Sequence, residues 1–468
     1  MREAAPPTVA YTTSRVAKST LLPAMANYDI RVTKYHEFYA NGVCVKNCMG
    51  DFHPHSTDAI EAVIVAMSQA ASSAPTIIGI GNFGSFDDKA AASRYTSCYL
   101  SPYAATMLDS DELTQVNMDP TYDGRLLEPR QLPAPVPHIL LVGCSSIGAG
   151  ASGNIPPLTP GWVYSALDAI VAGQRSRIRL PDAMAYRWGG RLLMLDPNWL
   201  HTGSGSATLR PLLKIENGCV IFTTLAPSID LASIEDRLSK HPGFAGLAEE
   251  SPAKGDLVRV VVRVARGQSP VELARFAAAN VIGRQSYSFL HIRQKDDGSN
   301  GVAFDPIIEG PLTYLQGWVD WRRKIVSGAA GYRIKALNAA IAHLDLLTLA
   351  ISKKDLLVRA LQLAKSREDL HARIKAILHC SDDDARTIRE IQFQRLAFLE
   401  VRELQAKRAE HVSSIKANTS IVTHPDHKLL LDARYSLTAL VETKRMAEDA
   451  RAINLKNKVK GKRRARTA

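Results

Sequence analysis

A tyrosine directly preceded by an arginine, Arg94–Tyr95, is a pair of side chains able to do covalent chemistry. A phenol is a weak nucleophile at neutral pH because its pKa is about 10, so it needs help in losing its proton. An arginine supplies a permanent positive charge and parallel N–H donors that match a phosphate. Most such pairs belong to packing or to the surface, so the neighbouring residues must decide whether this pair is catalytic.

Two histidines separated by one proline, His53 and His55, lie upstream of a glycine-containing segment at residues 81–85. Imidazoles relay protons near neutral pH and hydrogen-bond phosphate oxygens. With Cys44 and Cys48 the two histidines also offer four potential zinc ligands within a short stretch. The His-Pro-His spacing brings two ligands very close together and a second ligand pair of the usual kind is missing. We therefore favour no metal site on this chain.

The elements that must position these residues can be predicted from composition and periodicity. Residues 58–71 have the composition of a helix, and residues 75–80 read as a short buried strand. After the glycine-bearing turn, an alanine-rich turn of helix is expected at residues 90–94. An extended segment follows at residues 95–100. The tyrosine is thus expected where a helical turn meets a strand.

A second stretch begins after a proline-rich connector at residues 129–137. It opens with an apolar run, residues 138–142, that we expect to be a strand, and a loop of small residues then leads to Ile155 and two prolines. Mixed strands and helices predict an α+β domain. The further elements expected here are strands at 218–225 and 257–264 and a helix at 270–279.

Long helices are predicted from about residue 311 onward. Apolar residues recur there at alternating spacings of three and four, which is typical of a coiled-coil seam with one polar position. An internal helical hairpin would produce the same spacing, and spacing alone favours that simpler interpretation. The seam positions are Ile334, Leu337, Ile341, Leu344, Thr348 and Ile351, and the helical pattern continues to Leu404.

Composition bounds the remaining possibilities. The chain has 468 residues, 46% of them hydrophobic, which excludes wholesale disorder, and a net charge of +12. Seven of the eleven residues at 456–466 are basic, and we expect this tail to be a disordered arm that attracts phosphate or simply aids solubility. Uninterrupted apolar runs long enough for a membrane span are missing. Six cysteines in so long a chain favour a reducing, cytoplasmic compartment.

Three motifs in a fixed order together resemble a known family. His-Pro-His before a helix, Gly-Asn-Phe-Gly-Ser at 81–85, and Ala-Ala-Ser-Arg-Tyr-Thr at 91–96 are similar to the breakage–reunion subunit of type IIA DNA topoisomerases, which includes gyrase A and its topoisomerase IV counterpart. Residues 89–95 look especially like the medium subunit of the T-even bacteriophage topoisomerase. The resemblance continues at 143–157 and, loosely, at 318–323 and 391–400, over about residues 20–410.

The resemblance implies a role for each matched residue. Tyr95 would be the nucleophile that forms a 5′-phosphotyrosine link to DNA, and Arg94 would be its phosphate partner. His53 and His55 would border the scissile phosphate. Ile155 would be the apolar wedge that bends DNA between base steps. Further support of the phosphate and the active site would come from Arg31, Lys34, Asn82 and Ser85.

The same resemblance implies a fold and partners. The expected class is α+β multidomain: a winged-helix DNA-cleavage domain at 1–137, a tower domain at 138–310, a coiled coil with a helical C-gate dimer domain at 311–445, and the basic tail at 446–468. Mg²⁺ and ATP would bind a Toprim/ATPase partner subunit, and the chain would form a homodimer on double-stranded DNA in the cytoplasm, or in the host cytoplasm or nucleoid if it is viral. Since little chain follows the gate, relaxation and decatenation are expected rather than supercoiling.

The sequence departs from the family pattern in three places. Thr20 stands where an active-site arginine is expected, and Ser56 replaces the usual glycine after His-Pro-His. Asp58 and Ala62 occupy the helix positions at which the family has the serine and acidic residue that anchor quinolones, so weak poisoning by these drugs is expected. The altered N-terminal segment keeps open an alternative, a catalytically silent DNA-binding or scaffold paralogue. An unrelated helical scaffold with chance matches is the third possibility.

Overall fold

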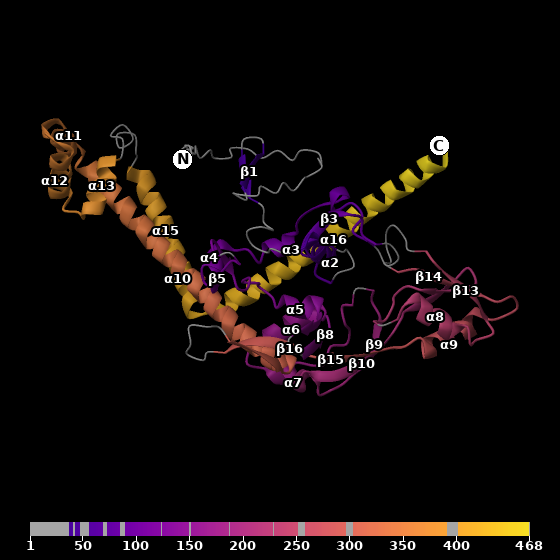
Figure 1. Ribbon diagram of the computed structural model, residues 1–468. Helices are drawn as coiled ribbons and strands as arrows, with labels where there is room; N and C mark the ends of the chain where they lie inside the picture. The colour runs from indigo at the N-terminus through magenta and orange to yellow at the C-terminus, as the bar shows by residue number, and fades with distance from the viewer. Residues whose placement is uncertain are drawn as a thin grey trace, which may run out of the picture.

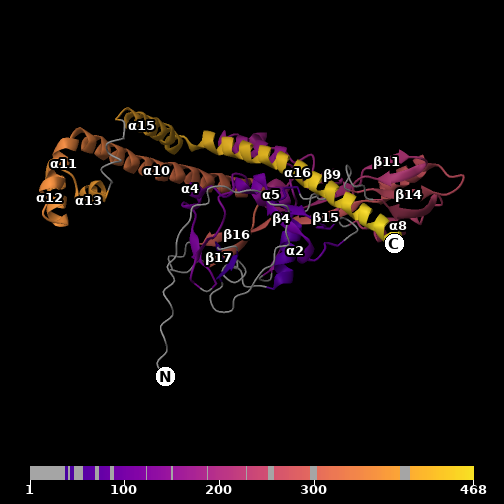
Figure 2. The same cartoon turned by 90° about the horizontal axis from the view of Figure 1, so that it is seen from above.

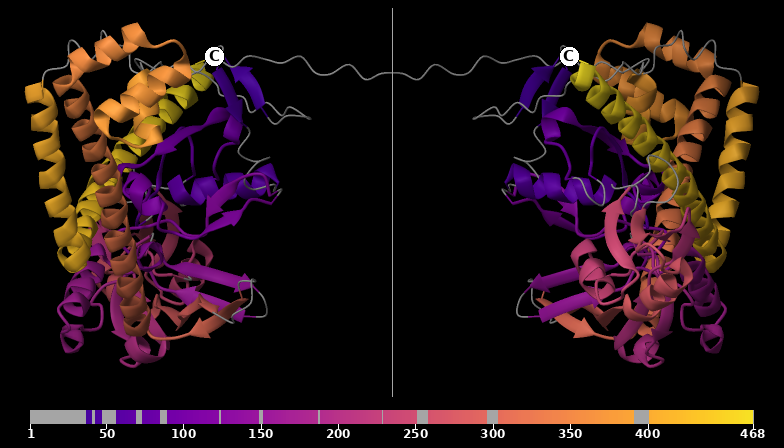
Figure 3. Two further views of the ribbon diagram at one scale, coloured as in Figure 1. Left: turned by 90° about the vertical axis from the view of Figure 1, so that its left-hand side faces the viewer. Right: turned by 90° about the vertical axis from the view of Figure 1, so that its right-hand side faces the viewer.

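A mixed α+β body carries a long helical arm in the computed structural model of this chain (Figure 1). The arm leaves the body on one side, and a second long helix runs back across the body toward the other side. Side views place the long helices along one side of the body (Figure 3). The structure describes residues 37–40, 43–46, 56–68, 73–84, 89–122, 124–148, 151–186, 188–227, 229–250, 258–295, 303–390 and 401–467.

The segment that carries the Arg–Tyr pair is built on an antiparallel hairpin. Strand β3 (Ile77–Ile80) pairs with β4 (Ser97–Leu100), and helix α2 (Thr57–Ser68) packs beside β3. These elements confirm the predicted helix, buried strand and extended segment. Further short elements of this region are β1 (Glu37–Ala40), β2 (Val43–Lys46), α3 (Pro102–Ala105), α4 (Ser110–Leu113) and the β5–β6 hairpin (Met118–Pro120, Leu127–Pro129).

The alanine-rich turn of helix expected at residues 90–94 is wrong. Residues 89–92 are not helical, and Ala92 has an extended backbone, with φ −59° and ψ 147°. Only one 3-10 turn forms, η1 (Ser93–Tyr95). A few alanines favour helix only weakly, because nucleating a single turn fixes several residues for one hydrogen bond.

The strand expected at residues 138–142 is also wrong, since this segment forms helix α5 (His138–Val142). Pro137 precedes the helix, and Gly143, at φ 71°, ends it. A Cβ atom at Gly143 would lie 2.6 Å from the carbonyl oxygen of Ile155, so the chain can make this close approach only with glycine. A short apolar run cannot by itself distinguish a buried helix from a buried strand. Leu140 and Leu141 are fully buried here, and a helix or a strand could bury them equally well.

The loop of small residues expected before Ile155 is instead a β-hairpin of β7 (Cys144–Gly148) and β8 (Ala151–Ile155). It forms one edge of a five-stranded sheet ordered β7-β8-β15-β10-β9. Serine, glycine and alanine do not favour a strand by themselves, so the pairing of β7 with β8, and of Asn154 in β8 with Ser288, accounts for this conformation. The other strands of the sheet are β9 (Arg191–Leu195), β10 (Ser204–Arg210) and β15 (Gly283–Ser288).

A second sheet, four-stranded and ordered β11-β12-β14-β13, lies at the end of the body opposite the arm (Figure 1). The strands expected at 218–225 and 257–264 are confirmed by the two central strands, Cys219–Phe222 and Val260–Val264. Val220, Ile221 and Phe222 are fully buried. The predicted helix at 270–279 is α9 (Pro270–Asn280). The other elements of this part are β11 (Leu213–Glu216), β12 (Cys219–Phe222), α8 (Leu231–Leu238), β13 (Phe244–Glu249) and β14 (Val260–Val264).

Around the first sheet the structure has further short elements that lead into the arm. Helix α6 (Pro160–Val171) buries one face, through Val163, Leu167 and Ile170, against the main core. Its N-cap is Thr159, whose side chain accepts a hydrogen bond from the backbone of Trp162. The remaining elements are η2 (Arg175–Arg177), α7 (Trp199–Thr202), β16 (Leu290–Lys295) and β17 (Ala303–Ile308).

The arm is a pair of antiparallel helices, α10 (Pro311–Ser352) and α15 (Val401–Thr423). Arg408 of α15 pairs with Asp345 in the later part of α10. Asp426, which follows the end of α15, pairs with Arg323 in the earlier part of α10, so α10 and α15 run in opposite directions. This is the internal helical hairpin that the seam spacing allowed. A small cluster at the tip consists of α11 (Lys354–Leu363), α12 (Arg367–Leu378) and α13 (Asp382–Glu390), packed on Leu346, Leu347 and Ala350.

Within the described residues, α10 is the one helix long and apolar enough to cross a membrane by length and composition. Only 11% of its most apolar stretch is buried inside the chain. The first half of the helix carries Arg322 and Arg323, which form ion pairs with residues outside the helix, and α10 also lies against α15. Most large apolar side chains of α10 are nevertheless buried or half-buried, and Tyr332 is the one large hydrophobic residue of this helix among those that are exposed in the described ranges.

Helix α16 (Pro425–Thr467) continues through the segment expected to be a disordered tail, so that expectation for residues 446–468 is wrong for the backbone up to Thr467. Alanine, lysine and arginine are strong helix formers, and the first half of α16 is docked on the body through buried Leu429, Ala433 and Leu440. Seen from above, α16 crosses the body as one uninterrupted helix (Figure 2).

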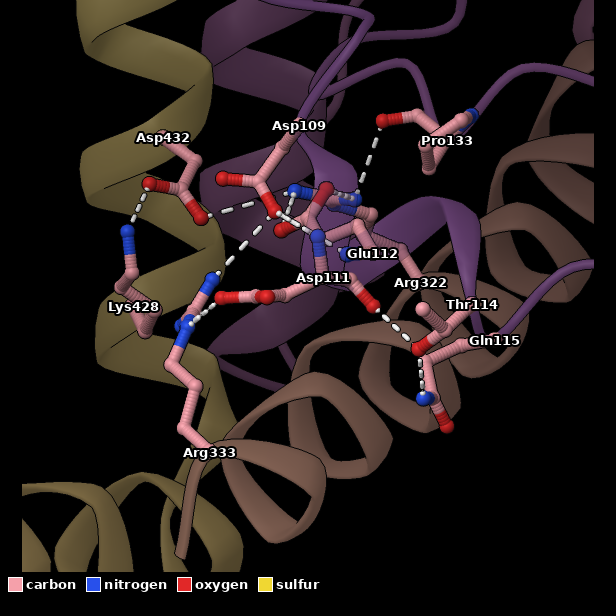
Figure 4. A network of polar contacts seen from close by, with 10 residues as sticks. All are labelled: Asp109, Asp111, Glu112, Thr114, Gln115, Pro133, Arg322, Arg333, Lys428 and Asp432. Carbon is pink, nitrogen blue, oxygen red and sulfur yellow. Dashed lines mark hydrogen bonds and ion pairs between the residues drawn. The ribbon is translucent and has the colours of Figure 1, made fainter. Parts of the chain in front are cut away.

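A buried ion-pair network holds the arm to the body (Figure 4). Arg322 of α10 is fully buried and donates to both carboxylate oxygens of Glu112 in α4, at 2.6 and 2.8 Å. It also donates to the carbonyl oxygen of Pro133, at 3.1 Å, and to Asp432 of α16, at 3.4 Å. One arginine thus ties α10, α4 and α16 together.

Candidate active site

The β3–β4 hairpin fixes where Tyr95 lies. Ile80 at the end of β3 is opposite Ser97 at the start of β4, so the intervening segment must turn sharply. Gly81 makes that turn possible at φ 109°, a conformation that L side chains rarely adopt. A Cβ atom at Gly81 would lie only 3.1 Å from the carbonyl oxygen of Tyr95. The turn therefore packs directly against the backbone of the tyrosine.

Asn82 closes the loop that precedes the Arg–Tyr pair. Its Nδ2 donates to the carbonyl oxygen of Lys89 at 3.3 Å, and its Oδ1 accepts from the backbone N–H of Gly84 at 3.0 Å. The backbone carbonyl oxygen of Asn82 accepts a hydrogen bond from the backbone N–H of Ala91 at 2.9 Å. Sequence reasoning placed Asn82 near the phosphate. Both ends of its amide are used here within the loop, so its evident role is to position the backbone.

Arg94 and Tyr95 project from this framework into solvent. The tyrosine side chain is 69% exposed, and the Cζ atom of Arg94 lies 4.7 Å from the centroid of its ring. Stacking of this kind contributes about 0.5–1 kcal/mol at an exposed site. An arginine over an aromatic ring commonly stacks through the face of the guanidinium, which leaves the N–H donors in its plane available. The same arginine can therefore steady the ring and bind a phosphate.

The two neighbouring tyrosines differ from Tyr95 as expected. Tyr99 lies within β4, opposite Ile78, and is 45% exposed without an adjacent arginine. Tyr103 is fully buried, and its hydroxyl makes a 3.0 Å hydrogen bond with Nδ1 of His138. Burial raises the pKa of the Tyr103 hydroxyl well above its usual value of 10. A tyrosine in that position is a structural residue.

Helix α16 packs against β3 of the hairpin and against α3, a contact that was not predicted from the sequence. The backbone N–H of Tyr103 donates to Oγ1 of Thr443 at 3.0 Å, and the hydroxyls of Thr106 and Ser436 are 2.8 Å apart. Thr443 and Ser436 are fully buried, and α16 also contacts β3. Small hydroxyl residues inside a helix are too common for this role to be predicted from sequence.

Ile155 lies at the end of β8 with its side chain only 2% exposed, within the main hydrophobic core. A side chain that is buried in this way is not available to insert between bases, which argues against the wedge role inferred from sequence. The β7–β8 hairpin has one other large apolar residue, Ile147, whose backbone pairs with Ser152. That pair is adjacent to Gly148 and Ala151, the last pair before the tip of the hairpin.

Several predicted site residues lie outside the described part of the chain. These include both histidines of the His-Pro-His motif. Cys44 lies in β2, but its side chain is not among those described. Across the described ranges, no three His, Cys, Asp or Glu side chains are grouped so that they could hold a metal ion. The predicted residues outside the described ranges are Thr20, Arg31, Lys34, Cys48, His53, His55 and Ser85.

An Arg–Tyr pair presented on a β-hairpin, in an α+β body with a long helical arm, is the arrangement expected of a type IIA topoisomerase cleavage subunit. Comparison with known families supports this class: the family of the DNA gyrase/topoisomerase IV A subunits matches residues 28–432. The chain belongs to this family.

Individual relatives are similar at modest identity. The chain is 28% identical to the DNA gyrase A subunit of Aminobacterium colombiense over 408 residues, 81% of this chain and 48% of that protein. It is 28% identical to the DNA topoisomerase 4 A subunit of Haemophilus influenzae over 406 residues, 83% of this chain and 52% of that protein. The matched region thus spans about half the length of these relatives.

Proposed function

We propose that this chain is the DNA-cleaving subunit of an ATP-dependent type II DNA topoisomerase. The observation that carries the proposal is the exposed Arg94–Tyr95 pair, which is held on the β3–β4 hairpin by the Gly81 turn and the Asn82 clamp. Membership of the gyrase A and topoisomerase IV A family supports it. The expected outcome is a transient double-strand break used for strand passage, in relaxation and decatenation.

The proposed reaction is a transesterification. The Oη atom of Tyr95 attacks a DNA phosphorus, a phosphorus–Oη bond forms, and the bond from phosphorus to the 3′ oxygen breaks. The phenol proton leaves with a base, and the departing 3′ oxygen takes up a proton. One phosphodiester replaces another, so the step is close to isoenergetic and can be reversed to reseal the DNA. Arg94 would bind the phosphate oxygens as negative charge builds on them.

Partner subunits would supply the other functions. We place Mg²⁺ and ATP on a Toprim/ATPase subunit, where the ion would stabilise charge at the scissile phosphate. Phosphate support from His53, His55, Arg31, Lys34 and Ser85 remains part of the proposal on the strength of the sequence resemblance alone. Among family members, the T-even bacteriophage medium subunit is proposed as the nearest in kind, because of the run at residues 89–95. The site of action would be the cytoplasm.

The proposed domains follow the structural segments. A winged-helix cleavage domain would end near residue 137 and a tower domain near residue 310, and the arm would be the coiled coil and dimerisation gate. For DNA bending, the buried state of Ile155 favours Ile147, beside the hairpin tip, as the apolar wedge. Substituting Ile147→Ala should reduce DNA bending, measured by energy transfer between duplex ends. Ile155→Ala should instead cost about 2–5 kcal/mol of stability.

Homodimerisation through the arm is supported by apolar side chains on α11. These side chains are 42–64% exposed within one chain, which is unusual for so many on a ten-residue helix. Leu363→Glu should convert a dimer to a monomer in light scattering. Val412→Glu, at an exposed site on the shaft of the arm, is the matched control and should leave the dimer intact. The exposed set is Leu356, Val358, Leu361 and Leu363.

The deciding experiment mixes the chain with a Toprim/ATPase subunit, Mg²⁺ and supercoiled plasmid, and then denatures with detergent. We expect protein covalently attached to 5′ DNA ends, lost in Tyr95→Phe and kept in Tyr99→Phe. Tyr99→Phe is the matched control, because it removes an exposed hydroxyl from the same hairpin. If the wild-type chain forms no adduct but still binds DNA, the catalytically silent paralogue becomes the better description.

A further inference from the structure

A glycine inside strand β3 leaves room for a group from outside the strand. Gly79 is buried and lies opposite Cys98 of β4. The φ of Gly79 is not positive, so its backbone would accept an ordinary L residue. Glycine weakens a strand and often marks a point where another group approaches closely. The reason for glycine at position 79 is therefore a neighbouring group and not the backbone conformation.

That neighbouring group is the ring of Phe83. A Cβ atom at position 79 would lie 2.5, 2.7 and 2.8 Å from Cδ2, Cε2 and Cγ of this ring. Ordinary contacts between carbon atoms are about 3.5–4.0 Å, so even the methyl group of an alanine would overlap with the ring. Phe83 is half-buried in this position. Its ring thus occupies the space that a side chain of β3 would otherwise fill.

This contact fixes the turn that precedes the nucleophile. Between Gly79 and Phe83 lie Gly81, which packs against the carbonyl oxygen of Tyr95, and Asn82. The backbone carbonyl oxygen of Asn82 accepts a hydrogen bond from the N–H of Ala91 at 2.9 Å. Packing of the ring on β3 therefore fixes the backbone against which the segment with the Arg–Tyr pair lies.

The segment that carries the nucleophile depends on such support. It is a single 3-10 turn, in which the N–H of Tyr95 donates to the carbonyl oxygen of Ala92 at 2.9 Å. The N–H and the hydroxyl of Thr96 both donate to the carbonyl oxygen of Ser93, at 3.1 and 3.2 Å. One turn of this kind has poor hydrogen-bond geometry and is too short to be stable alone. The position of Tyr95 is thus set by the turn on which it rests.

We propose that Phe83 is a positioning residue for DNA cleavage: its ring, packed on Gly79, holds the turn that places Tyr95 against the scissile phosphate. The inference deepens the proposed function and rests on it, because Tyr95 is taken as the nucleophile. Misplacing a reacting group by about 1 Å can cost roughly a hundredfold in rate. A contact within the hairpin can therefore control the rate of cleavage without contributing to DNA affinity.

Two substitutions disturb this contact from opposite sides. Phe83→Ala deletes the ring, and Gly79→Ala adds a methyl group where the ring lies. In Phe83→Ala that space is empty, so adding Gly79→Ala should have little further effect. Two residues that act through one contact are non-additive in this way. Phe83→Leu keeps an apolar side chain on Gly79 and should restore most of the activity. Tyr99→Ala is the matched control, because it removes a partly exposed ring from β4 of the same hairpin.

The position of the turn is measured first, on the full chain without DNA. Amide hydrogen exchange is read on a peptide that spans residues 89–97, which includes the hydrogen-bonded amides of Ala91, Tyr95 and Thr96. Phe83→Ala and Gly79→Ala should each raise exchange in this peptide about tenfold, because the turn opens locally. Exchange in α6 should stay at the wild-type level, and Tyr99→Ala should match the wild type in both regions.

The chemistry is measured next, with the Toprim/ATPase subunit, Mg²⁺ and a duplex in single-turnover conditions. The rate of formation of the 5′ covalent adduct should fall about 10–100-fold in Phe83→Ala and in Gly79→Ala. The Kd for DNA should stay within about twofold of the wild-type value, since the reacting geometry and not the binding surface is changed. The double variant should match Phe83→Ala, and Tyr99→Ala should match the wild type.

Wild-type exchange and wild-type adduct formation in Phe83→Ala would overturn the inference. Additive losses in the double variant would also overturn it, because the ring and Gly79 would then act separately. Equal losses in adduct rate and DNA affinity would make Phe83 a support of the DNA-binding surface instead of a positioning residue. If the wild-type chain forms no adduct, the proposed function fails, whereas exchange in the peptide at 89–97 still reports whether the ring holds the turn.

Discussion

The buried ion pair between Arg322 and Glu112 is expected to hold the arm to the body, and removing the charge of Glu112 tests this. Glu112→Gln keeps the shape of the side chain but removes its charge, which leaves Arg322 with a buried positive charge and weaker acceptors. Breaking a buried ion pair by removing one partner generally costs about 3–5 kcal/mol. The side chains of Arg322 and Glu112 are 1% and 7% exposed, so solvent cannot replace the lost partner.

The structure places the expected cost at the lower end of that range. Arg322 would keep the carbonyl oxygen of Pro133 and the more distant Asp432 as acceptors. We therefore expect about 3 kcal/mol, which is roughly a hundredfold increase in local opening. Asp426→Asn is the matched control, because Arg323 and Asp426 form a pair of the same chemical type with side chains 30% and 40% exposed. Exposed pairs contribute about 0–1 kcal/mol.

Amide hydrogen exchange followed by mass spectrometry is the assay, read on peptides from α4, the first half of α10 and the start of α16. Glu112→Gln should raise exchange in all three, and Asp426→Asn should change it little. A combined Arg322→Met and Glu112→Leu variant should recover most of the protection, since an apolar pair often replaces a buried ion pair without loss. Equal exchange in Glu112→Gln and the wild type would refute the reasoning.

Three further predictions concern Gly81 in the hairpin, the buried His138, and Asp58 with Ala62 on α2. Gly81→Ala should cost about 1–3 kcal/mol locally, because φ is 109° and the new Cβ would press on the backbone of Tyr95. Covalent adduct formation should fall while DNA affinity is kept, and an unchanged adduct yield would contradict this. Burial lowers the pKa of His138 from 6.5 to about 4. The unfolded chain therefore binds the proton more tightly, and about 3 kcal/mol of stability present above pH 6.5 should be lost as the pH falls toward 4. Urea unfolding between pH 4.5 and 7.5 should show that slope in the wild type, and a slope of equal size in His138→Gln would assign it elsewhere. Asp58 and Ala62 are both exposed on α2, one turn apart, and do not match the quinolone-anchoring pair. The wild type should form few drug-trapped breaks, and Asp58→Ser combined with Ala62→Asp should form more, as scored by plasmid linearisation.

The local sequence pattern was sufficient to predict several of the helices and strands and to single out the Arg94–Tyr95 pair. The helix at α2, the β3 and β4 strands, and the long α10 helix follow from periodicity and composition, which act over a few neighbouring residues. The Arg94–Tyr95 pair was predicted from its motif context, and the structure adds that it is exposed and stacked. The roles of His53 and His55 remain predictions, because these residues lie outside the described ranges.

Tertiary contacts decided what local pattern could not. The run at residues 138–142 is a helix that ends at Gly143, where the chain passes close to the backbone of Ile155, a contact that the local pattern does not reveal. The small residues of β7 and β8 became strands through pairing with each other and with β15.

Residue types and short spacings were enough to propose Tyr95 as the nucleophile with Arg94 beside it, and to predict the helical nature of the arm. The folded chain alone shows that Ile155 is buried, that Arg322 reaches Glu112, and that α16 contacts Tyr103. Each of these contacts joins residues far apart in the chain. A partner at such a distance leaves no periodic trace around either residue, so only the folded chain reveals it.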